Sequence, residues 1–586
     1  MSHLSSEAFE DGLDLQIGLV EAFIPNIRSD WTGYPFPQLK PLDEQEMRTF
    51  RSIILENAYL RVTVLPGLGG RIISLYDKRT GSEVLRRHPA IEPQGYGRRG
   101  TCVREGIQLF LDGEERLNAL GNVDTQIELA TDEDADAIAW VAETFTGTGL
   151  SFHLKICLPS DRAELRLEAR VFNRSLQPEN YNGAISAYLG DGTFDGSAFY
   201  SRERNAGLAI FCDERPFDGI AYQDGSLKYA RFAKNGRLAA RQVDNWSLVL
   251  VPFSGIGILT GAGREGAVSI ESGELTMQCT QQRLGHKLLL LTEEGQTVEA
   301  KVDLYPENLL KIPLGGLNPR SLVLRDPGKN EVLRFDTVPR PWVQQLEVSK
   351  AGANLLSDFS ATVDSLSIRS PALDLQRGTF DLSTRHLAHT LLGMRALAEK
   401  RYREASESFE QAHMYNADDP LAWWTKAVAL RLSEEDNQAE LLNAHYLAPL
   451  EPALRAESFL SQPIDLDGKP NPLLEPLEES PEEFIDVACL LIECGLYDQA
   501  SRWIDEAIRH RDLPMLRYLM AYCLKTATRL DAEASDQVRL AAESPIAPPF
   551  PFRTVEIEAI RSLLTAFPDD QKLKDLMAPL DYKGSR

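Results

Sequence analysis

The chain has 586 residues, of which 43% are hydrophobic and 25% charged, values typical of a globular protein rather than of a disordered or fibrous one. Its formal net charge of −25 argues against nucleic acid and anionic membrane surfaces as partners, because the average surface repels phosphate groups. The N-terminus is acidic and lacks a signal-peptide pattern, and no run of about 18 apolar residues occurs, so we expect a cytoplasmic protein that does not interact with membranes.

The N-terminal half has the pattern of a β protein. After an N-terminal extension at 1–50, residues 51–345 are a succession of short apolar or alternating segments such as LRVTVLP and LSFHLKICL. The period of two and the β-branched residues predict antiparallel strands. So many strands over roughly 300 residues favour one large β-sandwich over several small β domains. The first hairpin is predicted at YDKRTGSE (76–83), where Asp77 and Gly81 are turn formers.

The C-terminal half has a helical period and contains a repeat. After a polar connector at 346–380, residues 381–586 include two stretches that match the spacing of a tetratricopeptide (TPR) helix pair. Weaker copies lie at 420–450 and 516–530, and one unit cannot close a core alone. We therefore expect a TPR-like array that binds a protein partner or self-associates. The matching residues are Gly393, Tyr402, Ala405, Phe409 and Ala412, and then Ala488, Gly495, Tyr497, Ala500, Ile504 and Ala507.

A resemblance to a known family covers most of the chain. The stretch RSIILENAYLRVTVLPGLGGRIISLYDKRTGSEVLRRHPAIEP (51–93) resembles the opening of a bacterial domain family of unknown function fused to TPR repeats. The motifs YPFP (34–37), VFNRS (171–175) and PFPFRTVEIEAI (549–560) extend the similarity. The family belongs to the galactose-mutarotase-like superfamily. The resemblance implies a β-supersandwich followed by TPR-like helices, with a sugar lying across a concave sheet.

The residues expected to do chemistry depart from the family pattern. Mutarotation needs two groups that exchange protons with the sugar, and glycoside hydrolysis needs two facing carboxyls. Family members typically have Gly-Gly-Ile-Glu where this chain has EGIQ, so Gln108 stands where an acid is expected. The nearest match to a second family motif, Glu-Leu-Gln, is ELTMQ (274–278), with Thr276 at the acid's place, although a shifted alignment returns Glu274. We expect the usual acid pair to be missing.

The remaining candidates each have a structural alternative. Arg71 resembles the superfamily's early pocket arginine but is as readily a salt-bridge partner, whereas Arg104 is more readily paired with Glu105 on the sheet surface than bound to a ligand. A lone strand histidine such as His153 is more often structural than catalytic. Ligand-binding candidates are Arg71, Arg104, Gln108, Asp191, which is first a turn residue, and Trp246, which is as readily a core indole; weak catalytic candidates are Glu105, His153 and Glu274.

No cofactor or metal is expected. The glycine-rich runs GLGG (67–70) and GAGREG (261–266) precede no helical pattern and are predicted to be turns. The seven cysteines are scattered and include no CxxC pair, so we expect buried free thiols rather than disulfides or zinc.

Three functions follow from these patterns. The first is a carbohydrate-binding or scaffold protein that binds a mono- or oligosaccharide in the sandwich and a protein partner on the repeats. The alternatives are a sugar-active enzyme, an epimerase or glycosidase with a rearranged site, and a purely structural assembly partner.

Overall fold

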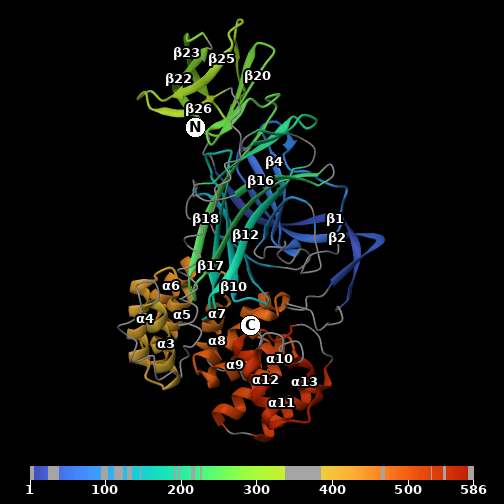
Figure 1. Cartoon of the computed structure of the whole chain (residues 1–586), viewed down its shortest axis with the longest axis vertical. Helices are drawn as coiled ribbons and strands as arrows, with labels where there is room; N and C mark the ends of the chain where they lie inside the picture. Colours follow the sequence, from blue (N-terminus) through green and yellow to red (C-terminus); the bar gives the residue numbers. More distant parts are fainter. Residues whose placement is uncertain are drawn as a thin grey trace.

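The computed structural model describes residues 5–23, 38–93, 103, 105–110, 123–128, 135–145, 147–189, 193–195, 198–212, 218–224, 227–292, 294–336, 385–462, 469–528, 531–544 and 549–577. The described chain is built from strands in its N-terminal part and from helices in its C-terminal part (Figure 1). This order confirms the predicted fold class. The connector at 346–380 lies outside the described residues.

Two large sheets face each other as a sandwich. The first contains, in spatial order, β16 (Asp218–Asp224), β17 (Leu227–Leu238), β12 (Glu179–Tyr188), β7 (Ile107–Phe110), β4 (Arg71–Asp77), β3 (Leu60–Leu65), β2 (Gln38–Glu56), β1 (Glu7–Phe23) and β6 (Ala90–Ile91), and β5 (Ser82–Glu83) pairs with β4. The second contains β13 (Thr193–Asp195), β14 (Ala198–Ser201), β15 (Ala206–Cys212), β18 (Val243–Ser254), β11 (Leu165–Asn173), β10 (Leu150–Leu158), β9 (Ala137–Thr144) and β8 (Asp124–Glu128).

A single apolar core fills the space between these sheets. Alternate side chains of each strand point into it, as the predicted period of two requires. The first sheet contributes Ile53, Leu55, Val62, Leu75, Ile107 and Ile185, and the second contributes Phe152, Leu154, Leu167, Trp246 and Leu248.

The N-terminal extension is part of the first sheet. β1 pairs with β2 along nearly its whole length, from Glu7 opposite Glu56 to Phe23 opposite Gln38. Ile17 and Phe50 pack together on the face of the sheet that lies away from the sandwich core. The boundary expected at residue 50 therefore falls inside β2.

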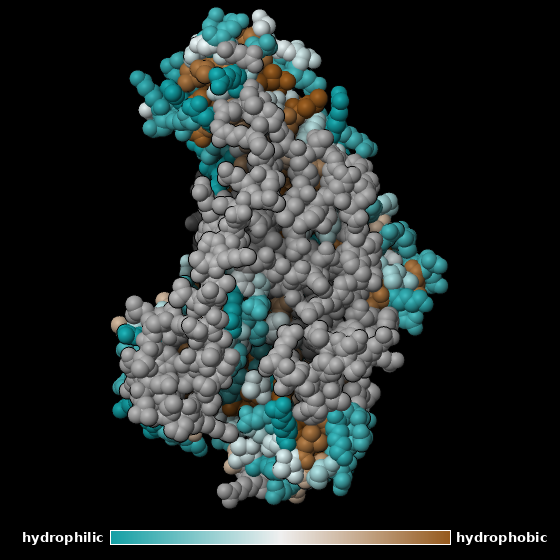
Figure 2. Space-filling model, viewed as in Figure 1, coloured by the Kyte–Doolittle hydropathy of each residue, from teal (hydrophilic) through white to brown (hydrophobic). Residues whose placement is uncertain are grey.

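The last strands of the β half form a second β unit, residues 261–336, at one end of the molecule (Figure 1). Most of its hydrophobic side chains form a core of their own, and Ala267 also packs with Val251 and Phe253 of the large sandwich in which these strands were expected. Figure 2 shows hydrophilic residues on its visible rim and hydrophobic ones toward its middle. Its sheets are β19 (Gly261–Gly263), β20 (Gly266–Glu271), β21 (Glu274–Cys279) and β24 (Leu310–Pro313), and β23 (Thr297–Leu304), β22 (Arg283–Thr292), β25 (Pro319–Arg325) and β26 (Glu331–Asp336).

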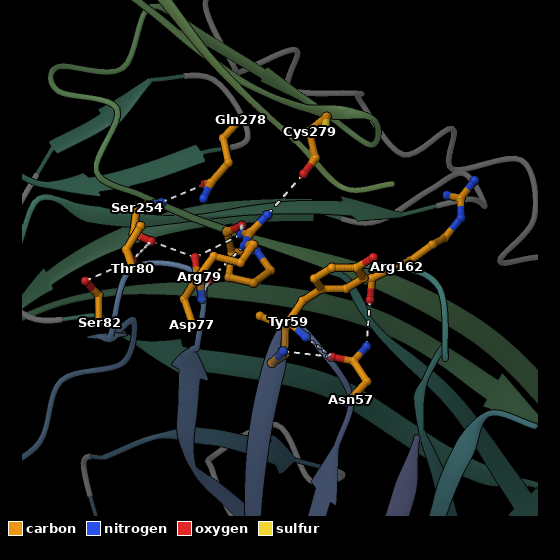
Figure 3. A network of polar contacts seen from close by, with 12 residues as sticks. Asn57, Tyr59, Asp77, Arg79, Thr80, Ser82, Arg162, Ser254, Gln278 and Cys279 are labelled. Carbon is orange, nitrogen blue, oxygen red and sulfur yellow. Dashed lines mark hydrogen bonds and ion pairs between the residues drawn. The ribbon is translucent and has the colours of Figure 1, made fainter. Parts of the chain in front are cut away.

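A buried polar network joins this unit to the sandwich (Figure 3). The predicted hairpin at 76–83 is present as β4 and β5, and its turn carries Arg79. Arg79 pairs with Asp77 at 2.8 Å and donates to the carbonyls of Cys279 in β21, at 3.1 Å, and Pro252 in β18, at 2.9 Å. Ser254 donates to Asp77 at 2.6 Å, and its backbone N–H donates to Gln278 at 2.9 Å. One arginine thus bonds three separate strands.

The two glycine-rich runs connect strands, as predicted. GLGG ends a 3-10 turn (Pro66–Leu68) between β3 and β4, and Gly69 adopts a left-handed conformation with φ 69°. GAGREG forms the β19–β20 hairpin.

The C-terminal half consists of successive helices packed against their neighbours. In the first predicted repeat Gly393 lets two helices meet, because a Cβ there would lie 2.6 Å from the Phe409 ring. None of the described helices is long and apolar enough to cross a membrane. The helices are α3 (Arg385–Ala398), α4 (Tyr402–Tyr415), α5 (Pro420–Leu432), α6 (Gln438–Leu447), α7 (Pro452–Leu460), α8 (Glu482–Glu493), α9 (Tyr497–His510), α10 (Pro514–Cys523), α11 (Asp531–Glu543), α12 (Thr554–Ala566) and α13 (Gln571–Met577).

The first helix of each matched pair ends in the same way. After α8, Gly495 is left-handed with φ 70°, and its N–H bonds the Ile492 carbonyl at 2.9 Å. After α3, Lys400 takes this conformation with φ 60°, and its N–H bonds the Leu397 carbonyl at 2.9 Å. Both are Schellman-type ends, where glycine is the favoured residue.

The helices pack directly on the sandwich. Phe172 and Ala240, from the β half, belong to the hydrophobic core of the helices. His386 in α3 is hydrogen-bonded to the Ala240 carbonyl at 3.0 Å, and Asn416 after α4 donates to the Arg241 carbonyl at 2.8 Å. The two halves share a continuous interface.

Candidate functional site

Three buried polar side chains lie on neighbouring strands of the first sheet. Arg71 begins β4, Gln108 is in β7, and Ser186 stands opposite Gln108 in β12. Their chain neighbours Ile72 and Ile107 point into the sandwich core. Because successive strand residues face opposite sides, these three face away from that core. Arg71 is 0% and Gln108 1% exposed.

Arg71 organises this group. One guanidinium nitrogen donates to the backbone carbonyl of Glu105 and another to Oε1 of Gln108. Because Arg71 donates to the amide oxygen of Gln108, the amide nitrogen is left to bond another group. That Nε2 atom is buried and has no hydrogen-bond partner within the described part of the chain. A buried donor without a partner is costly, by about 1–3 kcal/mol, so it marks a position suited to an incoming acceptor.

The Glu105 side chain adds a carboxyl near the Arg71 guanidinium group. It is 5% exposed. Gly106 has φ +66°, and a Cβ on it would lie 2.2 Å from the Ile72 carbonyl, so only glycine lets the chain approach β4 this closely. The Gly106 carbonyl accepts from the Tyr188 N–H at 2.9 Å, which fixes the segment against β12.

Burial raises the pKa of Glu105 to about 7, although Arg71 and Arg86 both act to lower it. A hydrogen bond from the His88 backbone also favours the charged form, and the charge of Glu92 favours the neutral one. Such a carboxyl exchanges its proton near neutral pH, as a general acid or base must. The exposed Glu92 is a second carboxyl close enough to act on Glu105.

The cluster, defined as Arg71, Glu105 and Gln108, brings together three of the residues singled out from the sequence. Arg104 and Asp191, the remaining polar ligand-binding candidates, lie outside the described residues.

The other candidates lie elsewhere. His153, in β10, lies between core residues and faces the opposite side of the second sheet. On that side its cross-strand neighbour Ala142 packs with Leu450 of the helical half. The burial of His153, with Arg174 and Arg170 nearby, lowers its pKa to about 3. Trp246 is buried in the sandwich core, 6.4 Å from the Phe152 ring. Glu274 is half-exposed in the second β unit, 3.5 Å from Lys311.

The segment after β5 was missed from the sequence as part of the site. Arg86, His88 and Glu92 all act on the Glu105 carboxyl. They lie in the stretch LRRHPAIEP, which carried the family resemblance. The charged residues of this stretch could have indicated from the sequence that it lies near the site.

Residues 32–195 match a family described as Domain of unknown function (DUF5107). These residues are therefore similar to a DUF5107 domain. The match confirms the predicted relationship to a domain family of unknown function, and the matched residues include the whole Arg71–Glu105–Gln108 cluster.

Several solved structures are similar to the chain. A TPR-domain containing protein from Parabacteroides distasonis is 14% identical, with a TM-score of 0.39 and 96% of each chain covered. A galactose mutarotase-like protein from Clostridium acetobutylicum is 10% identical, with a TM-score of 0.27, covering 35% of this chain and 96% of that one. A putative aldose 1-epimerase from Klebsiella pneumoniae is 10% identical, with a TM-score of 0.29, covering 42% of this chain and 91% of that one.

Proposed function

We propose that the chain is a carbohydrate-binding protein that holds a sugar at the Arg71–Glu105–Gln108 cluster and uses its helical array to bind a protein partner. The observation that carries the proposal is the Gln108 amide. Its oxygen is held by Arg71, and its buried nitrogen has no partner among the residues described.

Sugar hydroxyls match this arrangement because each hydroxyl both donates and accepts. The Gln108 N–H₂ donates, and the Glu105 carboxyl accepts when ionised. Neighbouring hydroxyls on one ring can therefore satisfy both groups at once. Arg71 is already engaged with the protein, so its role is to position Gln108.

A second candidate function, sugar epimerisation or glycoside hydrolysis, is favoured by the raised pKa of Glu105. At neutral pH this carboxyl has both protonation states available, and Glu92 is the second acid in such a mechanism. Gln108 remains a binding group, because its neutral amide cannot act as a general acid or base near neutral pH.

We propose a cytoplasmic location on the basis of the thiols. Cys157, Cys279, Cys489, Cys494 and Cys523 are buried and free, a pattern usual in reducing compartments.

Thermal denaturation of the full chain against a panel of mono- and oligosaccharides tests sugar binding. A ligand that binds the native state stabilises it by about 2.7 kcal/mol at a hundredfold excess over Kd. We expect at least one sugar at millimolar concentration to raise the melting temperature. No rise with any sugar overturns the binding proposal.

Gln108→Leu assigns the binding to the cluster. The variant keeps the side-chain volume but removes the amide, so the sugar-induced rise should disappear. Gln45→Leu, at an exposed glutamine of the β1–β2 ribbon, is the matched control and should keep the rise. If both variants respond to the sugar as the unaltered protein does, the sugar binds elsewhere.

Polarimetry of freshly dissolved sugar separates the enzyme from the binder. Acceleration of mutarotation that is lost in Glu105→Gln supports the epimerase. Binding without any acceleration or hydrolysis supports the binding protein.

A further inference from the structure

A cavity lies where the sandwich meets the helices. Its volume is about 460 Å³, within the range of small-molecule sites, which favour junctions between domains. The turn between β9 and β10 and the segment 174–179 after β11 form its β side. Helix α8 and the segment leading into α12 form most of its helical side. It shares no lining residue with the Arg71–Glu105–Gln108 cluster.

The cations in the wall of this cavity are already neutralised. Arg174 is hydrogen-bonded to Asp486 in α8 and to Glu451. Arg553 donates to the other oxygen of Asp486 at 3.0 Å and lies 3.4 Å from Glu556. Two guanidinium groups therefore face three carboxylates, and all of these groups are largely buried. An anionic ligand would find no net positive charge here.

The rest of the lining is acidic and aromatic. Glu493, at the end of α8, makes no hydrogen bond or ion pair with any residue that the structure describes. Tyr497 in α9 and Tyr522 in α10 meet edge to face, with ring centroids 6.4 Å apart. The Tyr522 hydroxyl donates to Glu558 at 3.4 Å. Carboxylates beside aromatic rings are the surroundings in which an organic cation is stabilised.

We propose that this cavity binds a small organic cation with an apolar body, such as an arylalkyl amine, whose ammonium group pairs with Glu493. The apolar body packs against Tyr497, Tyr522 and Leu490, which also line the cavity. Glu493 is partly buried, and no described cation forms an ion pair with it directly, so the ammonium supplies a direct partner that the nearby arginines do not.

Protonation of Glu493 gives the site a pH dependence. Burial raises the pKa of Glu493 to about 7, the charge of Asp486 acts in the same direction, and Arg241, Arg174 and Arg553 act to lower it. An alkylammonium group resembles that of lysine, with a pKa of about 10, so it stays charged between pH 6 and 8. Affinity for the amine should therefore rise with pH over this interval as Glu493 ionises.

Calorimetric titration of the full chain with tryptamine and with tryptophol tests the proposal, because the two probes share the indole and differ in the charged group. We expect tryptamine to bind at pH 8 at least tenfold more tightly than tryptophol, with the ratio falling toward pH 6. Equal affinities for the two probes, or no binding of tryptamine, overturn the proposal.

Two variants locate the interaction. Glu493→Gln should weaken tryptamine binding tenfold or more and leave tryptophol unaffected. Glu533→Gln, at an exposed glutamate of α11, is the control and should bind as the unaltered protein does. Unchanged tryptamine binding by a folded Glu493→Gln overturns the assignment. If that variant fails to fold, the pH dependence of the tryptamine-to-tryptophol ratio in the unaltered chain decides, and a constant ratio overturns the proposal.

Discussion

Replacement of Glu105 by glutamine should stabilise the protein at high pH and not at low pH. The pKa of Glu105 is raised from 4.5 to about 7 in the folded chain, so the folded state holds this proton more tightly than the unfolded state does. Below pH 4.5 the group is protonated in both states, and its effect on stability is absent. As the pH rises from 4.5 to 7 the native protein loses stability, and above 7 the loss is complete.

The size of the effect follows from the shift. A change from 4.5 to about 7 corresponds to roughly 3 kcal/mol, as an upper limit. For a chain of 586 residues that melts in one cooperative transition, this amounts to roughly 2–3 °C in melting temperature. Glutamine carries no charge at any pH, so Glu105→Gln should melt higher than the unaltered chain at pH 8, and the difference should shrink toward zero near pH 5.

Differential scanning calorimetry of both proteins at pH 5, 6, 7 and 8 measures this difference. Glu168→Gln, at an exposed carboxylate of β11, is the control and should show no comparable trend. A difference between Glu105→Gln and the unaltered chain that is the same at pH 5 and pH 8 would refute the reasoning, because the carboxyl would then not titrate in this interval.

Three further substitutions test the packing. Arg79→Ala should cost about 3–5 kcal/mol by leaving Asp77 buried without its partner, measured as a lower denaturation midpoint; an unchanged midpoint contradicts the buried-network assignment. Gly106→Ala should lower the free energy of unfolding by about 1–3 kcal/mol from backbone strain alone, and an unchanged denaturation midpoint contradicts this. If sugar binding is lost as well, the close approach of Gly106 to β4 is needed to form the site. Lys400→Gly should stabilise the helices by about 1 kcal/mol, because glycine takes the left-handed conformation at no cost; a lower melting temperature would contradict this.

The general architecture could be predicted because it follows from local periodicity. The period of two and the TPR spacing placed the β half, the helical half and the hairpin at 76–83. The separate core of residues 261–336 could not be predicted, since strands of one sandwich and of two small sheets have the same period. The sequence pattern puts the boundary at residue 50, inside β2, because the alternation of apolar and polar residues is weak in the polar N-terminal part of this strand.

The candidate site was predicted only in part. Gln108 and Arg71 were identified through the resemblance, and the structure joins them by a hydrogen bond. The raised pKa of Glu105 depends on burial, which a strand pattern does not reveal. Arg174 and Asp486 lie 312 positions apart, so no local pattern in the sequence pairs them.

The shared interface between the halves affects how the protein can be divided. Arg174 comes from the sandwich, whereas Glu451 and Asp486, its two carboxylate partners, come from the helices. Cutting the chain at the connector would leave a buried arginine on one fragment and buried acids on the other, and would expose Phe172 to water. The halves should therefore melt in one cooperative transition, and each fragment expressed alone should aggregate unless the other is supplied with it.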